Sequence, residues 1–240
     1  MSGHSKWSTI KRQKGAADVK RGATFTKLSN AVTIAVKQGG GIGDPEQNPR
    51  LRLAIELARS ANMPKENIQR AIERATSKGA GDLSELTYEG FAPGGVSVLV
   101  EAVTDNTNRT TSEVKGIFHK AGASFGQPGS VSYLFEQTAE ITVNKGDKTI
   151  DDIFLAAAEL GADDVEDRGE EVGVYTSVHN LSAVKNGLAA QGFDVVSSEI
   201  SMKPKTQMEV GEDVKEKVIN FLSTLEELDD VQKVYSNISL

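Results

Sequence analysis

The first 22 residues of the chain combine side chains that suit phosphate binding. They contain six lysines and arginines and a single acid, Asp18. The only tryptophan of the chain, Trp7, lies beside Lys6, so its ring can stack on a base while the ammonium group contacts a phosphate. Three glycines keep this backbone mobile. The pattern predicts a nucleic-acid-binding arm, and the alternative is an ordinary solvated tail.

Basic residues continue behind the arm. Lys20 and Lys27 are seven residues apart, which places them on one stripe of a helix, away from its apolar face. Arg52 and Arg59 repeat this spacing on the next expected helix. The candidate nucleic-acid-binding residues are therefore Lys6, Trp7, Lys11, Arg12, Lys14, Lys20, Arg21, Lys27, Arg52 and Arg59.

The charge of the chain is divided between its two parts. Residues 1–80 carry 15 Lys and Arg against 6 Asp and Glu, whereas residues 81–240 carry 12 against 28. The basic part can attract phosphate, and the acidic part prevents indiscriminate adhesion to polyanions. The expected partner is a nucleic acid, either DNA or ribosomal or transfer RNA, and the ribosome itself is a further possibility.

Composition excludes several other classes of protein. The chain has no cysteine, which rules out disulfides, thiolate zinc sites and a cysteine nucleophile. No apolar stretch approaches the roughly 20 residues of a membrane helix, and the N-terminus lacks the apolar core of a secretory signal. We expect a cytoplasmic monomer without membrane contact. A basic, acid-poor N-terminus could also belong to a transit peptide, which is the weaker interpretation.

Four further patterns could do chemistry, and each has a simpler explanation. "QGGGIGDP" lacks the Lys-Ser or Lys-Thr of a phosphate-binding loop and follows no strand, so it predicts an interhelical loop. "TDNTNRTTSE" could bind an anion with Arg109, but helix capping by Thr110 and its Asx neighbours explains it better. The three histidines show no ligand spacing, and the acids of "DDVEDRGEE" do not match a calcium loop. We expect no catalytic residues, no metal and no cofactor.

The elements that must position the basic residues are helical at first. Apolar residues recur at helical spacing between residues 25 and 36, and Gly39–Gly41 end that segment. Asn48 and Pro49 are typical of a second helix start, and Pro64 repeats the signal before a third helix. Residues 1–80 are thus predicted to form a basic three-helix domain with an arm.

Strand patterns begin at residue 86. "VSVLVEAVTDN" predicts a buried strand, "TTSEVKGIFHKAG" a helix with a capping box from Thr110 to Glu113, and "SVSYLFEQ" a second strand with Val131, Tyr133 and Phe135 on one face. Residues 137–205 then show a complete β-α-β-β-α-β series, which is the ferredoxin-like pattern. A helix and a strand follow.

This order predicts an α+β protein in which the three-helix domain precedes two ferredoxin-like domains, one inserted in the other. The expected domains are residues 1–80, residues 81–136 plus 206–240, and the inserted residues 137–205.

Three segments resemble the YebC family, which also includes mitochondrial activators of cytochrome oxidase translation. They begin "GHSKWSTIKRQKG", "DPEQNPRLRLAIE" and "YEGFAPGGVSVLV" and follow one another in order up to about residue 136. The inserted domain and the C-terminal tail match the family only in length and layout, and the GGGIGDP loop is slightly longer than the usual glycine-Asp-Pro turn. The resemblance implies a helical first domain, two α+β domains and no enzymatic activity.

The resemblance leaves two functions open. Members of the family have been described as DNA-binding transcriptional regulators, which makes a non-enzymatic regulator of gene expression the first expectation. The second is a ribosome-associated translation factor that relieves stalling, for example at proline runs, through RNA contacts of the basic domain. Phosphate contacts do not identify the polymer, so the residues alone do not separate the two.

Overall fold

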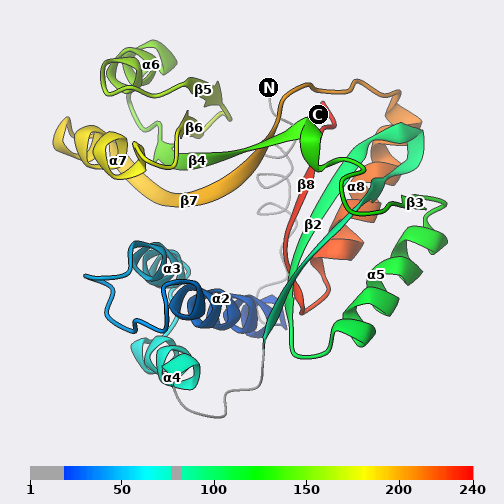
Figure 1. The fold of residues 1–240 in the computed structure, drawn as a ribbon. Helices are drawn as coiled ribbons and strands as arrows, with labels where there is room; N and C mark the ends of the chain where they lie inside the picture. The colour runs from blue at the N-terminus through cyan, green and yellow to red at the C-terminus, as the bar shows by residue number, and fades with distance from the viewer. Residues whose placement is uncertain (1–18, 77–82, 240) are drawn as a thin grey trace.

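A computed structural model describes residues 19–76 and 83–239 of the protein, and side chains of the first range from residue 24 onward. Within these ranges the chain forms seven α-helices and two four-stranded antiparallel sheets (Figure 1). Helices come first in the sequence and the two α+β units follow. The predicted fold class is confirmed.

The first unit is a bundle of three helices around a small apolar core. Leu28 and Val32 pack there against Leu51 and Ile68, each from a different turn or helix. The hydroxyl of Thr33 donates to a backbone carbonyl oxygen of the third helix and fixes its position. The helices are α2 (Val19–Gln38), α3 (Pro49–Ser60) and α4 (Lys65–Thr76).

The loop between α2 and α3 is closed by one asparagine. The side chain of Asn48 accepts the N–H of Leu51 at 3.1 Å as the N-cap of α3, and its amide donates to the carbonyl oxygen of Ala35 at 2.9 Å. Gly40 and Gly41 have φ of 73° and 81°, a backbone conformation that favours glycine. "QGGGIGDP" therefore joins two helices, as predicted.

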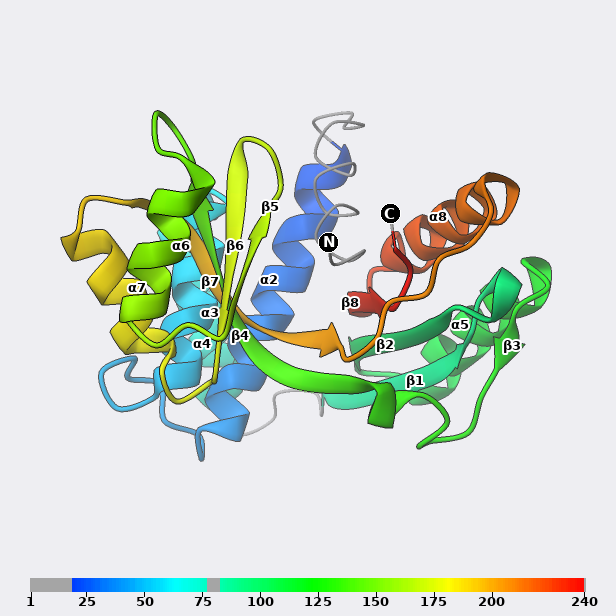
Figure 2. The ribbon, with the colours of Figure 1, turned by 90° about the horizontal axis from the view of Figure 1, so that it is seen from above.

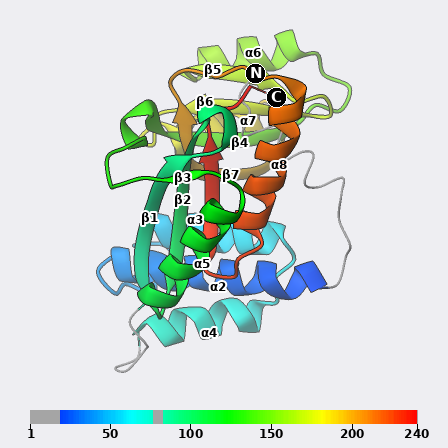
Figure 3. The same cartoon turned by 90° about the vertical axis from the view of Figure 1, so that its right-hand side faces the viewer.

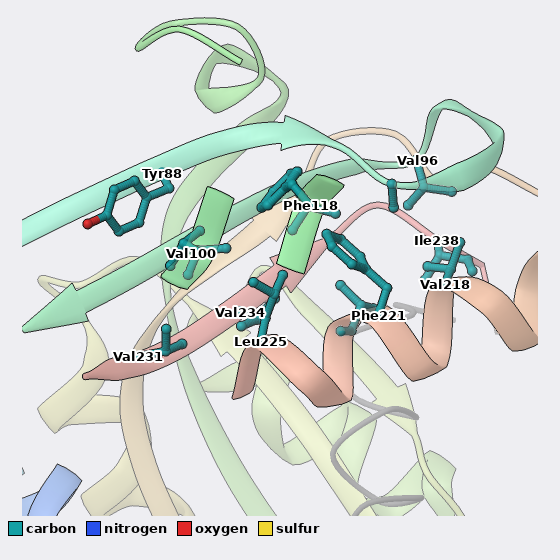
Figure 4. Packing of buried hydrophobic residues seen from close by; sticks show 14 of the residues in the cluster. Tyr88, Val96, Val100, Phe118, Val218, Phe221, Leu225, Val231, Val234 and Ile238 are labelled. Atoms are coloured by element: carbon teal, nitrogen blue, oxygen red, sulfur yellow. The ribbon is translucent and has the colours of Figure 1, made fainter. Parts of the chain in front are cut away.

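The second unit is a sheet with two helices on one face. The rings of Phe118 and Phe221 meet edge to face at 4.9 Å between centroids and join those helices over the sheet (Figure 4). The helices lie side by side (Figure 3). Strand order is β3-β1-β2-β8. The elements are β1 (Ser84–Phe91), β2 (Ser97–Thr104), α5 (Thr107–Lys120), β3 (Ser124–Phe125), α8 (Glu212–Glu226) and β8 (Val231–Ser236), with a 3-10 turn at Pro93–Gly95.

The third unit has the predicted β-α-β-β-α-β sequence of elements. Its strand order, β5-β6-β4-β7, is that of a ferredoxin-like sheet. Ile141, Val143, Val172 and Val174 face the two helices and form its core. The elements are β4 (Phe135–Asn144), α6 (Ile150–Glu159), β5 (Asp164–Asp167), β6 (Glu171–Thr176), α7 (Leu181–Ala190) and β7 (Asp194–Pro204).

Two local predictions are wrong. Val131–Phe135 is not a strand with one apolar face, because Ser132–Leu134 form a 3-10 turn and Tyr133 is 64% exposed. The strand that starts at Phe135 belongs to the other sheet. The missing strand of the first sheet is supplied by β1. The strands of this sheet therefore lie side by side as in a ferredoxin-like sheet, but they follow one another in a different order along the chain. The second error concerns α5, which begins after Asn106 rather than at a Thr110–Glu113 capping box.

The two sheets are joined by the long pair β4 and β7. Their ladder runs from Phe135↔Pro204 to Asn144↔Asp194 and reaches from one sheet to the other (Figure 2). At its near end Phe135 packs against Leu99 and Tyr235 on the face of the first sheet opposite α5 and α8. Helix α3 packs against β7, so the basic bundle contacts the inserted unit directly.

Candidate nucleic-acid interface

The predicted binding residues fall into two groups. Lys6, Trp7, Lys11, Arg12 and Lys14 lie outside the described residues. Lys20 and Arg21 belong to α2, but their side chains are not described. The remaining three, Lys27, Arg52 and Arg59, are described in full and differ in their surroundings.

Arg59 is an exposed cation at the C-terminal end of α3. Its guanidinium has no hydrogen bond or ion pair to the part of the chain that the structure describes. Lys65 and Arg70 on α4 are equally exposed and equally without a partner among the described residues, although Glu66 lies four positions before Arg70. Residues 61–64 join the two helices, so Arg59 and Lys65 lie on either side of one short connection, and Arg70 lies further along α4. Unpaired exposed cations of this kind can neutralise phosphates without first breaking an ion pair.

Arg52 shares its helix stripe with Arg59 but has partners. Its guanidinium donates to the carbonyl oxygens of Pro45 and Glu46, each at 3.1 Å, and lies 3.9 Å from the Glu46 carboxylate. Arg74 is bound as well, because it donates to Asn30 at 3.1 Å and to Thr33 at 2.9 Å on α2. Both arginines hold parts of the bundle together.

Lys27 points toward the α+β part of the molecule. Its ammonium group donates to the carbonyl oxygen of Glu226 at 2.5 Å, at the end of α8. Arg50 also lies on that side of the bundle, and its guanidinium bonds to the Gln38 side chain. Lys27 and the Arg52–Arg59 stripe are therefore not brought together on one surface.

A cavity of about 490 Å³ lies between the bundle and the two sheets, beside the contact of α3 with β7. Lys27 and Arg50 line it from the helices, and Glu101, Glu199 and Lys233 line it from the strands. Lys233 bonds to the Glu199 carboxylate at 2.8 Å and to the carbonyl oxygen of Ile200 at 2.7 Å, which ties β8 to β7.

Charges on the strand side of this cavity compensate one another. Burial raises the pKa of Glu101, and the nearby Lys233 and the Tyr235 hydroxyl oppose that shift only in part. Burial alone would lower the pKa of Lys233, but Glu199 and Glu101 outweigh it and raise the pKa. These groups are used to hold β2, β7 and β8 together, and they do not present a basic surface.

The alternative anion site at Arg109 is occupied by carboxylates of the protein itself. Its guanidinium bonds to Asp230 at 2.7 Å and to Asp105 at 3.1 Å. Burial would raise the pKa of Asp230, but hydrogen bonds from Arg109, Thr110 and Thr104 outweigh it and lower the pKa. The segment joins β2, α5 and the start of β8, which agrees with the capping interpretation, although Asn106 is the cap.

Metal and membrane sites are not found in the described part of the chain. Within residues 19–76 and 83–239 no group of three or more histidines and acids could hold a metal ion. His119 and His179 are exposed and far apart in the chain. Among the same residues, no helix has the length and apolar character needed to cross a bilayer.

Sequence reasoning missed Lys65 and Arg70 as candidates. The signal that selects them is the lack of a partner, which depends on tertiary structure. The same signal separates Arg59 from Arg52, which the seven-residue spacing treated as equivalent. The described candidates are Arg59, Lys65 and Arg70; in the sequence, the arm that precedes α2 carries most of the excess positive charge of the basic domain.

Two family models together match almost the whole chain. A family model described as the TACO1/YebC protein N-terminal domain matches residues 5–78, and one described as the TACO1/YebC second and third domain matches residues 83–238. The chain belongs to the TACO1/YebC family. The resemblance found in the sequence is thus confirmed.

TACO1/YebC relatives match along their full length. Proteins from Rubrobacter xylanophilus and Roseiflexus castenholzii, each named a probable transcriptional regulatory protein, are both 48% identical to this chain over 242 and 245 residues. Each alignment covers 100% of this chain and 96% of the relative. The crystal structure of a conserved hypothetical protein, Aq1575, from Aquifex aeolicus has a TM-score of 0.86 at 44% identity and covers 93% of this chain and 92% of that chain. The relatives' names support the class of regulator.

Proposed function

We propose that this protein is a non-enzymatic regulator of gene expression in the cytoplasm that binds nucleic acid through its N-terminal basic domain. The observation that carries the proposal is that Arg59, Lys65 and Arg70 are exposed and have no side-chain partner among the described residues, in a domain whose first 22 residues are strongly basic. In a protein whose remaining 160 residues carry an excess of acid, such cations direct a polyanion to one end of the molecule.

The binding is expected to depend on the phosphate backbone. Lysine and arginine contacts to phosphate supply affinity and orientation but do not read sequence. In the described part of the bundle, no aromatic side chain is available to stack on bases, because Phe25 packs against the core. Base contacts, where they occur, are therefore assigned to the arm and its Trp7.

The test compares two variants of equal charge change. Arg59, Lys65 and Arg70 are replaced together by Gln, and the control replaces Lys120, Lys148 and Lys217, exposed lysines of the acidic part, by Gln. Binding to duplex DNA of unrelated sequences and to ribosomal RNA should weaken for the first variant and hardly change for the control. Equal binding of both variants would show that the bundle is not the interface.

A ribosome-associated translation factor is the second candidate. It is favoured by the acidic α+β part, which suits a target that contains basic proteins as well as RNA. Sedimentation of the protein with ribosomes through sucrose supports this candidate. A duplex bound about a thousandfold more tightly than competitor DNA would instead support a promoter-binding regulator.

A further inference from the structure

Helix α6 exposes two large apolar side chains next to each other. Phe154 is 50% exposed and Leu155 is 63% exposed, whereas Ile153, Ala156 and Ala157 of the same helix are buried against the sheet. Exposed large side chains are common singly, but two adjacent ones on a helix form a continuous apolar surface.

Helical spacing extends this surface along α6. Ala158, which is also exposed, is three residues after Leu155 and four after Phe154, so the three side chains are neighbours. Figure 2 shows α6 and α7 on the outer side of the second sheet, facing away from α5 and α8. The apolar surface of α6 is therefore not a contact between the units described here.

The surroundings of this surface are acidic. Helix α6 contains Asp151, Asp152 and Glu159 and no lysine or arginine. Asp151 is exposed and lies three and four residues before the apolar pair, and Glu159 is exposed four residues after Leu155. Asp152 is used by the helix itself, because it closes a capping box with Thr149. Two lysines lie between β4 and the helix: Lys145, which forms an ion pair with Asp167, and Lys148.

Charge limits what can cover this surface. A nucleic acid or an anionic lipid surface would be repelled by Asp151 and Glu159. A second copy in a twofold contact would bring the same acids of both copies together, which costs free energy. A basic protein surface with an apolar residue at its centre is attracted by these acids and brings no like charges together.

We propose that the face of α6 formed by Phe154, Leu155 and Ala158, with Asp151 and Glu159 at its edge, binds a basic protein. The contact is small, since a helix of ten residues is about 15 Å long, and it belongs to the class of weak, transient interfaces. Two such weak contacts on one chain, α6 and the basic domain, strengthen each other when one assembly carries both partners. This inference goes beyond the proposed function and is tested with a separate probe.

The experiment uses the full chain and two purified probes. One probe is deproteinised ribosomal RNA, and the other is the total protein extracted from ribosomes, a predominantly basic set. The variant Phe154→Ser/Leu155→Ser should bind the protein probe about tenfold more weakly and the RNA probe unchanged, because apolar anchors at an interface centre carry most of its affinity. The variant with Arg59, Lys65 and Arg70 changed to Gln should show the reverse pattern.

Two further variants make the result specific. Asp151→Lys/Glu159→Lys changes only the charged edge and should also weaken binding to the protein probe. Ile42→Ser/Val196→Ser alters exposed apolar residues elsewhere and should leave both probes unaffected. Unchanged melting temperatures of all variants exclude a folding defect.

Equal binding of the wild-type chain and the Phe154/Leu155 variant to the protein probe would overturn the α6 proposal. So would a wild-type dimer that the same substitutions dissociate, since the occupant would then be a second copy. If the wild-type chain does not bind the RNA probe, the proposed function is contradicted. The α6 proposal is still tested in that case, by the difference between the wild type and the Phe154/Leu155 variant on the protein probe.

Discussion

The carboxylate of Glu89 accepts the backbone N–H of Val131 at 2.7 Å, although 42 positions separate the two residues in the chain. It also accepts the N–H groups of Gly129 at 2.8 Å and Ser132 at 2.9 Å. Glu89 is only 5% exposed, so a buried charge is held mainly by the backbone N–H groups of a loop, together with the Ser132 side chain. That loop leads into β4 and thus fixes where the inserted unit begins.

Glu89→Gln is expected to destabilise the protein in a pH-dependent way. Burial would raise the pKa of Glu89, but the backbone N–H groups outweigh it and lower the pKa below its ordinary value. A lowered native pKa stabilises the fold fully above the unfolded pKa of about 4.3, and this contribution is lost as the pH falls through the native pKa.

Urea unfolding of the wild type and of Glu89→Gln between pH 7 and pH 3 checks this. The difference in the free energy of unfolding should be largest at neutral pH and should shrink in acid. A difference that grows on acidification has the wrong sign and would show that another group dominates.

Two glycines of the first α+β unit should respond oppositely to alanine. A Cβ at Gly90 would lie 2.4 Å from the carbonyl oxygen of Ser124 and 2.5 Å from the Phe118 ring. Gly90→Ala should therefore destabilise by about 1–3 kcal/mol. At Gly116, inside α5, nothing lies within 4 Å of the added atom, and Gly116→Ala should stabilise by about 0.5–1 kcal/mol. Thermal unfolding of both variants measures the contrast, which a loss of stability at Gly116 would contradict.

The inserted unit contains a buried arginine whose removal should be costly. Arg168, with a side chain only 4% exposed, bonds to Glu140 at 2.8 Å and to the Tyr175 hydroxyl at 2.8 Å. It lies over Gly173, which has no side chain to displace it. Arg168→Leu leaves the carboxylate of Glu140 buried without its cation, and the expected loss is about 3–5 kcal/mol.

Lys145→Gln is the matched control for Arg168. It breaks a more exposed ion pair with Asp167, 2.9 Å long, and should change stability by less than about 1 kcal/mol. Denaturant unfolding, monitored by a probe in the inserted unit, gives the free energy of unfolding of the two variants for comparison. Similar small losses for both variants would show that the buried cluster tolerates an uncompensated charge.

Salt dependence should separate paired from unpaired cations of the bundle. Each of Arg59, Lys65 and Arg70 that contacts phosphate should, when changed to Gln, lower the log–log slope by about 0.9 on duplex DNA and about 0.7 on a single strand. Arg52→Gln should change the slope less, because Glu46 already lies beside its guanidinium. Fluorescence anisotropy titrations at several salt concentrations give the slopes, and an equal effect of Arg52 would refute the distinction.

Trp7→Ala should weaken binding through loss of base stacking and not through loss of phosphate contacts. Loss of base stacking is expected to weaken binding to single strands by about 1–3 kcal/mol with little change in the salt slope. The same titrations measure both quantities. A changed slope with unchanged affinity at low salt would argue against stacking by Trp7.

Most elements could be predicted because their signals are local. Asn48 and Pro49 mark a helix start, and the alternating polar and apolar residues of β4 and β6 mark strands; both signals lie within a few neighbouring residues. The strand predicted at residues 131–135 failed because Val131 and Phe135 are indeed buried, but they enter a cluster between the sheets through a 3-10 turn. Burial was inferred correctly there, and backbone conformation was not.

The candidate site depended more strongly on tertiary structure. Arg52 and Arg74 look like Arg59 and Arg70 in the sequence, yet the first two are bound to loop carbonyls or to α2. β1 was overlooked as a partner in the first sheet because strand neighbours that are permuted in chain order leave no local signal. Which strands and side chains pair depends on contacts between distant segments, and the composition of one segment does not predict such contacts.

The ladder between β4 and β7 also has a consequence for the order of folding. Phe135 pairs with Pro204, and the N–H of Lys205 donates to the carbonyl oxygen of Leu134 at 2.9 Å, so the chain leaves and re-enters the first sheet at one point. Before the inserted unit folds, β8 is separated from β2 by a long loop whose closure costs entropy. Pairing of β4 with β7 removes residues 135–204 from that loop and so lowers the entropy cost of closing it. Folding of the inserted unit therefore favours completion of the first sheet, and a defect in the insert also slows the pairing of β8 with β2.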